Sequence, residues 1–341
     1  MDLLLGLRRE ERMRMPPTIF VKELDASELQ GFQEDLIEFI KRIIAYFRAI
    51  FGGDEPEDDL TDTSIPYGVR VCGAPRMWSQ GFTGEGVVVG IIDTGITNHP
   101  DLVNNVVFRK DYVGGGSFNE HGTHVAGTVA ANGQIKGVAY EAKLHDYRVL
   151  DSRGTGSNED IATAIRDAAN QGCHIINLSL GGRLGNTSLR EAVQYAASKN
   201  VIIIAAAGNE GDGINLTPEF SYPAMYEECC SVGSANRTDT ETAPSSFTNS
   251  NDQVDCCCQG ENVLSTGPDN NYLVLSGTSM AAPHVAGMCA LLIQRAFSTS
   301  GSYKRDEILA ELDGYAHDIY ISGPDNTTGS GFVTFNSSLS T

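Results

Sequence analysis

Apolar residues in the middle of the chain form two kinds of pattern, which alternate along the sequence. Continuous apolar runs of strand length are typical of strands that are buried on both faces of a sheet. Two longer stretches instead have apolar residues at helical spacing. The expected strands cover residues 87–92, 143–150, 174–178, 201–205 and 230–234, and the expected helices cover 160–171 and 189–199. This alternation predicts an α/β fold with a parallel, mostly doubly wound sheet and helices on both faces.

A separate amphipathic helix is predicted near the start of the chain, at residues 27–51. Ser27 and Gln30 fit a capping box at its beginning, and Gly52-Gly53 fit its end. Its apolar stripe needs a docking surface; the main domain of the same chain is the simplest one, and a partner protein or a membrane interface are alternatives. An acidic linker follows. We therefore divide the chain into an N-terminal segment, 1–63, and a main domain, 64–341.

The last long apolar run, Met280 to Ile293, follows the small residues Gly277-Thr278-Ser279. Its spacing predicts a helix with Pro283 in the first turn, where a proline is tolerated. Ser279 would then sit where a turn becomes a helix. Two interpretations stay open for this serine: a helix cap, or a nucleophile at a helix N-terminus, where backbone N–H groups favour developing negative charge.

Charge and length exclude some classes of function. The chain has 341 residues and a net charge of −20, so a nucleic-acid partner is not expected. No apolar stretch reaches the roughly 20 residues of a transmembrane helix, and the first residues do not form a secretory signal. We expect a protein inside the cell; the alternative is a secreted protein whose signal is missing or atypical.

The eight cysteines are not spaced as a disulfide framework or as a zinc site. Most are expected to be buried as small apolar residues in a reducing compartment. A link between the pair Cys229-Cys230 and the run Cys256-Cys257-Cys258 stays open, on the condition that their strands are neighbours.

Three polar residues, Asp93, Asn209 and Ser279, lie near strand ends or at a turn into a helix, where active sites form in sheets of this kind. Asp93 follows the first strand, His121 precedes a helix of small residues, and Asn209 follows the fourth strand. Each alone has a structural alternative, such as a cap or a turn. Together with Ser279 they supply an orienting acid, a general base, an oxyanion donor and a nucleophile.

The segments around these four residues resemble the subtilisin family of serine proteases, from about Ile65 to the end of the chain. The matching segments are Asp93-Thr94-Gly95, His121-Gly122-Thr123-His124-Val125-Ala126-Gly127, Ala207-Gly208-Asn209-Glu210-Gly211 and Gly277-Thr278-Ser279-Met280-Ala281. The resemblance implies the three-layer subtilisin-like fold and a serine endopeptidase with a Ser279-His121-Asp93 triad, Asn209 as oxyanion donor and no required cofactor. His124 would be structural. Alternatives are a specialised processing protease or peptide ligase on the same scaffold, and a binding protein that has kept only the fold.

The resemblance also implies how peptide or protein substrates would bind. Family members clamp an extended peptide between two backbone edges, which gives broad specificity. The matching positions are Gly154, Thr155 and Gly156 on one edge and Ser179, Leu180 and Gly181 on the other. The pocket for the residue before the cleaved bond would have Ser221 near its floor and Glu210 at its rim. We expect a large apolar residue there, while Glu210 leaves room for lysine or arginine.

Two departures from the family concern metal ions and cysteines. Many members insert a calcium loop after the catalytic histidine, but residues 131–137 are short here and include Lys136. We expect that strong calcium site to be absent and Asp101 to be a surface or capping residue. A weaker cation site near Ala224, Tyr226 and Asp255 stays open. The cysteine run at 256–258 replaces the usual Ala-Pro-Gly and is expected to be buried.

The N-terminal segment is the third departure. Ile65-Pro66-Tyr67-Gly68 resembles the start of mature family members. Residues 1–63 are therefore expected to be a prosegment, an inhibitor or folding assistant of the main domain, that the enzyme removes by autocleavage near residues 61–64.

Overall fold

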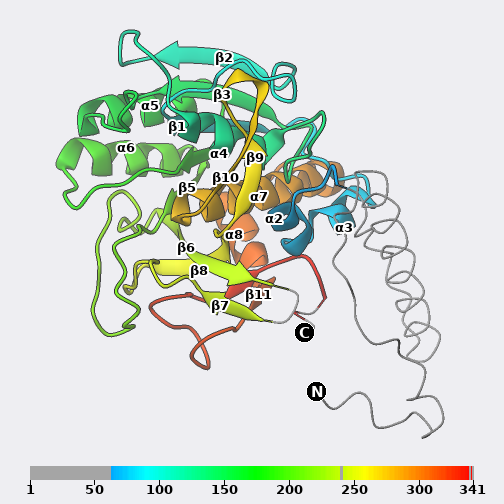
Figure 1. Ribbon diagram of the computed structural model, residues 1–341, viewed down its shortest axis with the longest axis vertical. Coiled ribbons are helices and arrows are strands. Elements are labelled where there is room, and N and C mark those ends of the chain that lie inside the picture. The colour runs from blue at the N-terminus through cyan, green and yellow to red at the C-terminus, as the bar shows by residue number, and fades with distance from the viewer. Residues whose placement is uncertain (1–62, 239–240, 338, 340–341) are drawn as a thin grey trace, which may run out of the picture. The chain divides into compact units, whose positions relative to one another are not determined.

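The computed structural model describes residues 63–238, 241–337 and 339 (Figure 1). The predicted helix at 27–51 and nearly all of the predicted prosegment lie outside these residues, so both stay predictions. Within the described part no helix is long and apolar enough to cross a membrane.

A ten-stranded sheet forms the centre of the fold, in the order β11-β12-β8-β6-β5-β4-β1-β3-β2, with β7 paired to β6. All pairs from β2 to β12 are parallel, and β7 and β11 are antiparallel to their neighbours. The predicted mostly parallel sheet is confirmed. Its strands are β1 (Val88–Asp93), β2 (Val106–Asp111), β3 (Lys143–Arg148), β4 (Ile175–Leu178), β5 (Ile202–Ala206), β6 (Cys229–Arg237), β7 (Thr242–Pro244), β8 (Val254–Gln259), β11 (Ala316–His317) and β12 (Phe332–Val333).

Helices cover both faces of the sheet, in three layers (Figure 1). Neighbouring residues of β1 show why its apolar run is continuous: Ile91 belongs to the core under α4 and α7, and Ile92 to the core under α5 and α6. The helices are α2 (Tyr67–Val71), α3 (Ala74–Trp78), α4 (Glu120–Ala130), α5 (Asn158–Asn170), α6 (Thr187–Ser198), α7 (Thr278–Ser300) and α8 (Arg305–Asp313). A separate hairpin of β9 (Val263–Thr266) and β10 (Tyr272–Leu275), joined through a 3-10 turn (Pro268–Asn270), packs on α4.

Two helices begin two residues before their predicted starts, because capping residues set the boundary. Ser157 Oγ accepts the N–H of Asp160 at 3.0 Å and caps α5. Asn186 Oδ1 accepts the N–H of Leu189 at 2.8 Å and caps α6. The side-chain oxygen of a cap satisfies a free donor of the first turn, so the helix starts at the cap and not at the first apolar residue.

The long helix α7 differs from the prediction at Pro283. The helix begins at Thr278, so Pro283 lies in its second turn rather than its first. Without an N–H, the proline leaves the carbonyl of Ser279, four residues earlier, without its helical donor. The hydroxyl of Ser179 fills this gap, because its Oγ donates to the Ser279 oxygen at 2.8 Å. A side chain at the end of β4 is thereby joined to the start of α7.

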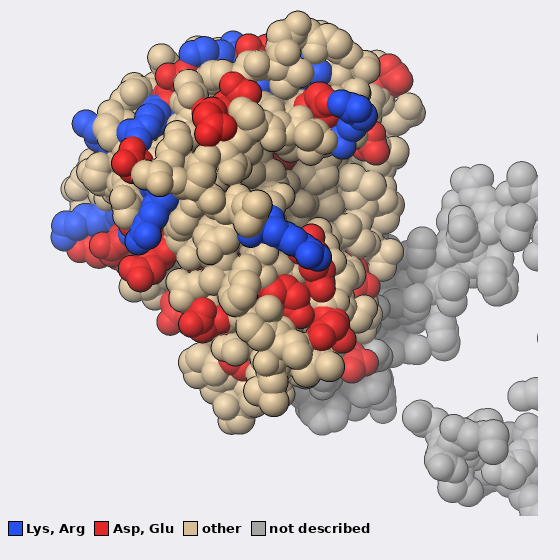
Figure 2. Space-filling model, turned by 90° about the vertical axis from the view of Figure 1, so that its left-hand side faces the viewer, with Lys and Arg blue, Asp and Glu red and all other residues tan. Residues whose placement is uncertain are grey.

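On the face shown in Figure 2, acidic and basic side chains are interspersed between large uncharged areas. The negative charge on this face is therefore spread out and not gathered in one patch. Such a mixed surface is typical of a soluble domain rather than of a surface that steers one charged macromolecule.

Candidate active site

A carboxylate and an imidazole meet at the end of strand β1. His121 Nδ1 lies 2.9 Å from Asp93 Oδ1 and 3.0 Å from Oδ2. The Asp93 residue is 1% exposed, and its Oδ1 also accepts the N–H of Thr94 at 2.6 Å. Since the carboxylate is buried and paired, it fixes the orientation of the ring and favours a proton on Nδ1.

The first turn of α4 holds His121 in this position. Asn119 caps the helix, and its Oδ1 accepts the His121 N–H at 2.9 Å. Thr94 Oγ1 accepts the next N–H, from Gly122, at 2.9 Å. A Cβ at Gly122 would lie 2.5 Å from the carbonyl oxygen of Gly95, so only glycine allows this approach. The end of β1 and the start of α4 are thus fixed to one another around the pair.

The surroundings of His121 change its pKa in two opposite directions. Burial lowers the pKa, while the negative charge of Asp93 and the hydrogen bond to it raise the pKa, and the net effect is a pKa above the usual 6.5. The ring is nevertheless 27% exposed, so one side of it is open to a ligand.

Ser279 is the second residue of α7, and it does not cap that helix. The capping position is Gly277, and no side chain caps this end. Ser279 Oγ donates to the carbonyl oxygen of Ser179 at 3.2 Å. In the described part of the chain the Ser279 N–H has no hydrogen-bond acceptor, so it is available to a ligand. The capping interpretation of Ser279 is therefore wrong.

Asn209 lies after β5 and touches the start of α7. Its Oδ1 accepts two hydrogen bonds from Thr278, one from the N–H at 2.8 Å and one from Oγ1 at 3.0 Å. The residue is exposed. Because the oxygen is occupied on the α7 side, the Nδ2 amide is left for a ligand.

A cavity of about 450 Å³ opens beside His121. All six residues predicted for the two substrate edges line it: Gly154, Thr155, Gly156, Ser179, Leu180 and Gly181. Glu210 and Ser221 do not line it. Further lining residues that the sequence did not indicate are Leu150, Asn158, Ile161 and Tyr222. Neither edge is part of a strand: residues 154–156 follow a turn that comes after β3, and residues 179–181 follow β4 directly.

Ser221 supports the second edge from behind, and Tyr222, which lines the cavity, pairs with Gly182 next to that edge. A Cβ at Gly181 would lie 2.2 Å from Ser221 Oγ, so the two residues are in close contact. Gly182 and Tyr222 exchange two backbone hydrogen bonds, at 3.0 and 2.8 Å. Ser221 is 6% exposed and therefore lies behind the edge instead of facing the cavity.

The second histidine of the motif, His124, is fully buried. Its Nε2 lies 2.8 Å from the carbonyl oxygen of Val263 in β9. Burial lowers its pKa to about 4, so the ring is neutral at neutral pH. These contacts join α4 to the β9–β10 hairpin.

Asp101 is not a surface residue, so the first of the two alternatives expected from the sequence, a surface or a capping residue, is wrong. It is 4% exposed, and its carboxylate closes the short loop after α4. Oδ1 accepts the N–H of Gln134 at 3.0 Å, and Oδ2 accepts the N–H of Ile135 at 2.9 Å and the hydroxyl of Tyr272 at 2.9 Å. A short loop can bring its N–H groups onto the carboxylate, which is why the residue became buried.

Replacing Asp101 by alanine is expected to lower the free energy of unfolding by about 1–3 kcal/mol or more. This is the cost of leaving one buried donor, such as the Ile135 N–H, without a partner. Chemical denaturation of the purified protein measures this. The matched control is Glu85→Ala, an exposed position where we expect a change within about 0.5 kcal/mol. Equal stability of Asp101→Ala and the parent would contradict the role given to this carboxylate.

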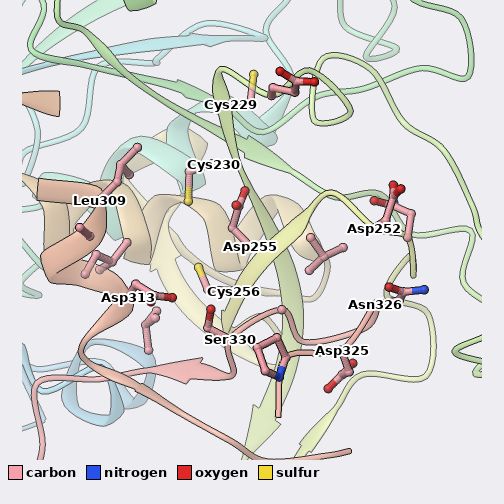
Figure 3. A pocket seen from close by; sticks show the side chains of 18 of the residues that line it. Cys229, Cys230, Asp252, Asp255, Cys256, Leu309, Asp313, Asp325, Asn326 and Ser330 are labelled. Carbon is pink, nitrogen blue, oxygen red and sulfur yellow. The ribbon is translucent and has the colours of Figure 1, made fainter. Parts of the chain in front are cut away.

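A second cavity, of about 470 Å³, is lined by one of the remaining predicted cation residues and by Cys229, Cys230 and Cys256 (Figure 3). Asp255 lines it, whereas Ala224 and Tyr226 do not. Within the described residues no group of three or more His, Cys, Asp or Glu side chains is arranged to hold a metal ion. The weaker cation site near Ala224, Tyr226 and Asp255, made of carbonyl oxygens and one carboxylate, stays a prediction.

All eight cysteines are buried and free, which confirms their predicted burial. Strands β6 and β8 are neighbours, as a link between Cys230 and Cys256 would require, and these two side chains point toward one another beside the cavity (Figure 3). The hydrogen bond with Cys256 and burial raise the pKa of Cys230 well above its usual value. Its thiol is therefore protonated and of low reactivity.

Comparisons with known proteins identify the family. The model of the subtilase family matches residues 84–331. The chain is 45% identical over 249 residues to the major intracellular serine protease of Bacillus subtilis (strain 168), covering 69% of this chain and 77% of the relative. It is 39% identical over 277 residues to subtilisin Savinase of Lederbergia lenta, covering 79% and 97%. A solved structure, the S41 psychrophilic protease, matches with a TM-score of 0.69 and 32% identity over 80% of this chain and 98% of that chain. The chain therefore belongs to the subtilase family and is a serine endopeptidase.

Proposed function

We propose that the chain hydrolyses peptide bonds by acyl transfer to Ser279, with His121 as general base, Asp93 as the residue that orients it and Asn209 as an oxyanion donor. The observation that supports this best is the buried Asp93 carboxylate 2.9 Å from His121 Nδ1, beside a cavity lined by both expected substrate edges. This pairing places the imidazole in the tautomer whose Nε2 can accept a proton.

In the proposed reaction, Ser279 Oγ turns from the Ser179 carbonyl toward His121 and attacks the substrate carbonyl carbon. His121 Nε2 takes the hydroxyl proton, and the negative charge of Asp93 stabilises the imidazolium that forms. The tetrahedral oxyanion accepts hydrogen bonds from Asn209 Nδ2 and the Ser279 N–H. The imidazolium then donates its proton to the leaving amine. A water molecule, activated by the neutral imidazole, releases the acyl group by the same steps in reverse order.

The pKa of His121 predicts the acid side of the pH profile. The general base must be neutral, and its pKa is above 6.5, so activity is expected to fall as the pH drops through a value above 6.5. The measurement is kcat/KM of a neutral peptide substrate from about pH 5 to pH 9. An acid limb with an apparent pKa below about 6 would contradict the Asp93–His121 pairing in the free enzyme.

The proposed substrates are extended peptide segments with broad sequence specificity. The backbone edges at 154–156 and 179–181 would pair with the substrate main chain, which every sequence has in common. A large apolar residue before the cleaved bond is preferred in this proposal, with lysine or arginine accepted near Glu210. No cofactor is required.

Residues 1–63 are proposed to act as a prosegment that the enzyme removes near residues 61–64. The supporting observation is sequence similarity alone, at Ile65-Pro66-Tyr67-Gly68. One relative, from Bacillus subtilis, is named a major intracellular serine protease, which supports a site of action inside the cell. Mass spectrometry of the parent and of Ser279→Ala tests the cleavage: a full-length, fully active parent would contradict it.

The direct test of the proposed reaction is hydrolysis of a fluorogenic peptide by His121→Ala. We expect a loss of nearly all activity, because the serine hydroxyl then lacks a base. His317→Ala, in the remote strand β11, is the matched control and should hydrolyse the peptide at the parent rate. A His121→Ala protein as active as the parent would refute the assignment.

A further inference from the structure

The side chain of Asn249 is fully buried beside the turn that contains Asn209. Its Oδ1 accepts the N–H of Glu210 at 2.7 Å, and its Nδ2 donates to Glu210 Oε2 at 3.1 Å. Its own N–H donates to the carbonyl oxygen of Gly208 at 3.1 Å. Asn249 therefore binds the residues on both sides of Asn209, although the two asparagines are far apart in the sequence.

Close packing leaves this turn no room to move toward Asn249. Gly208 has φ +111°, and a Cβ there would lie 2.1 Å from Asn249 Nδ2. Gly211 donates to the carbonyl oxygen of Phe247 at 3.0 Å, and a Cβ at Gly211 would lie 2.0 Å from the Thr248 oxygen. Residues 247–249 thus form a rigid support under residues 208–211.

On its other side the turn is fixed by Thr278, which precedes the serine. Thr278 donates twice to Asn209 Oδ1, and its Oγ1 accepts the N–H of Gly208 at 3.2 Å. Asn209 itself is exposed and has little packing to restrain it. The direction of its Nδ2 amide therefore depends on two anchors, Thr278 and Asn249.

We propose that Asn249 is a positioning residue for the oxyanion donor Asn209. The inference rests on the proposed role of Asn209 and adds to it the residue that holds this donor in place. A donor that is preorganised stabilises the transition state without reorganisation at the moment of reaction. If Asn209 is no longer held in place, the charged intermediate loses more stabilisation than the bound substrate does. We therefore expect kcat to fall and KM to change little.

The test compares Asn249→Ala with the parent and with Asn251→Ala. Asn251 is the matched control: it is 2% exposed, lies in the same segment and donates to Glu219, away from the 208–211 turn. We expect kcat of Asn249→Ala to fall about 10- to 100-fold at similar KM, the size of effect that a small misplacement causes. Inhibition by a peptide boronate, which forms a tetrahedral adduct with a serine, should weaken by a similar factor. Asn251→Ala should keep the kcat of the parent.

An exchange variant separates positioning from damage to the fold. Asn249→Asp alone places a second carboxylate against Glu210 and is expected to lower kcat. In the double variant Asn249→Asp/Glu210→Gln the new amide at position 210 donates to the new carboxylate at position 249. Glu210 Oε2 also accepts the Asn209 N–H at 3.1 Å, which that amide cannot do, so kcat should recover only in part relative to Asn249→Asp. The substrate has phenylalanine before the cleaved bond. This side chain is uncharged, so the loss of the Glu210 charge should not by itself change substrate binding.

Asn209→Ala, measured in parallel, distinguishes the two proposals. A loss of kcat in Asn209→Ala with an unchanged Asn249→Ala overturns the inference and leaves the proposed mechanism standing. Unchanged kcat in both variants overturns the role of Asn209 and the inference with it. Equal losses in Asn249→Ala and Asn251→Ala, or a double variant no better than Asn249→Asp, show a general structural effect and overturn the inference.

Discussion

Replacing Ser279 by alanine is expected to lower kcat about 10⁶-fold, the magnitude known for loss of the nucleophile in a subtilisin. The change removes one hydroxyl at the start of α7, where the backbone is fixed by the Ser179 contact to the Ser279 carbonyl oxygen. That contact uses the hydroxyl of Ser179 and the backbone oxygen of Ser279, so it does not depend on the hydroxyl that is removed. The fold should therefore persist. Hydrolysis of a fluorogenic peptide gives kcat, and thermal unfolding confirms that the variant is folded.

Ser179→Ala is the informative comparison for this variant. It removes the hydrogen bond to the Ser279 carbonyl oxygen and keeps the nucleophile, so activity should fall far less than in Ser279→Ala. A Ser279→Ala protein within tenfold of the parent rate would show that another group attacks the substrate.

Replacing Asp93 by asparagine is expected to have the second largest effect, about 10⁴-fold on kcat, as known for the equivalent change in a chymotrypsin-like protease. The side chain keeps its size, but an amide N–H facing Nδ1 favours the tautomer with the proton on Nε2. His121 then cannot accept the proton of Ser279. The pH profile gives a second readout: without the Asp93 charge the pKa of His121 should fall.

The control for Asp93→Asn is Asp146→Asn on the neighbouring strand β3. Asp146 is 4% exposed, pairs with Arg109 at 2.7 Å, and burial raises its pKa to about 6. It does not touch His121, so we expect less than a tenfold loss of kcat. Equal losses in the two variants would indicate that a buried negative charge in general, and not the pairing with the histidine, supports activity.

Patterns along the sequence were sufficient for the centre of the sheet but not for its edges. Strands β1, β4 and β5 are buried on both faces and read as continuous apolar runs. The edge strand β2 contains Arg109 and Lys110 and is partly exposed, so it lacks such a run. Strand β8 includes the cysteine run, and β11 and β12 have two residues each. Their pairing depends on neighbours far away in the chain.

The same limit applies to the site. Asp93 and His121 could be predicted because each lies beside a clear element boundary. Asn119, two residues before His121, could have been found as the cap of α4. Asn249 could not: its partners are about 40 residues away in the sequence, and no local pattern marks a buried asparagine that supports a turn. Thr278, 69 residues from Asn209, is a similar case.

The most direct test of the central claim is covalent labelling by a fluorophosphonate, which reacts with a serine only when a base and an oxyanion site activate it. The parent protein is labelled, digested and analysed by mass spectrometry, beside Ser279→Ala, His121→Ala and heat-unfolded parent. The account predicts one label, on the peptide that contains Ser279, in the folded parent alone. A folded parent that stays unlabelled, or a label on another residue that persists in Ser279→Ala, would contradict it.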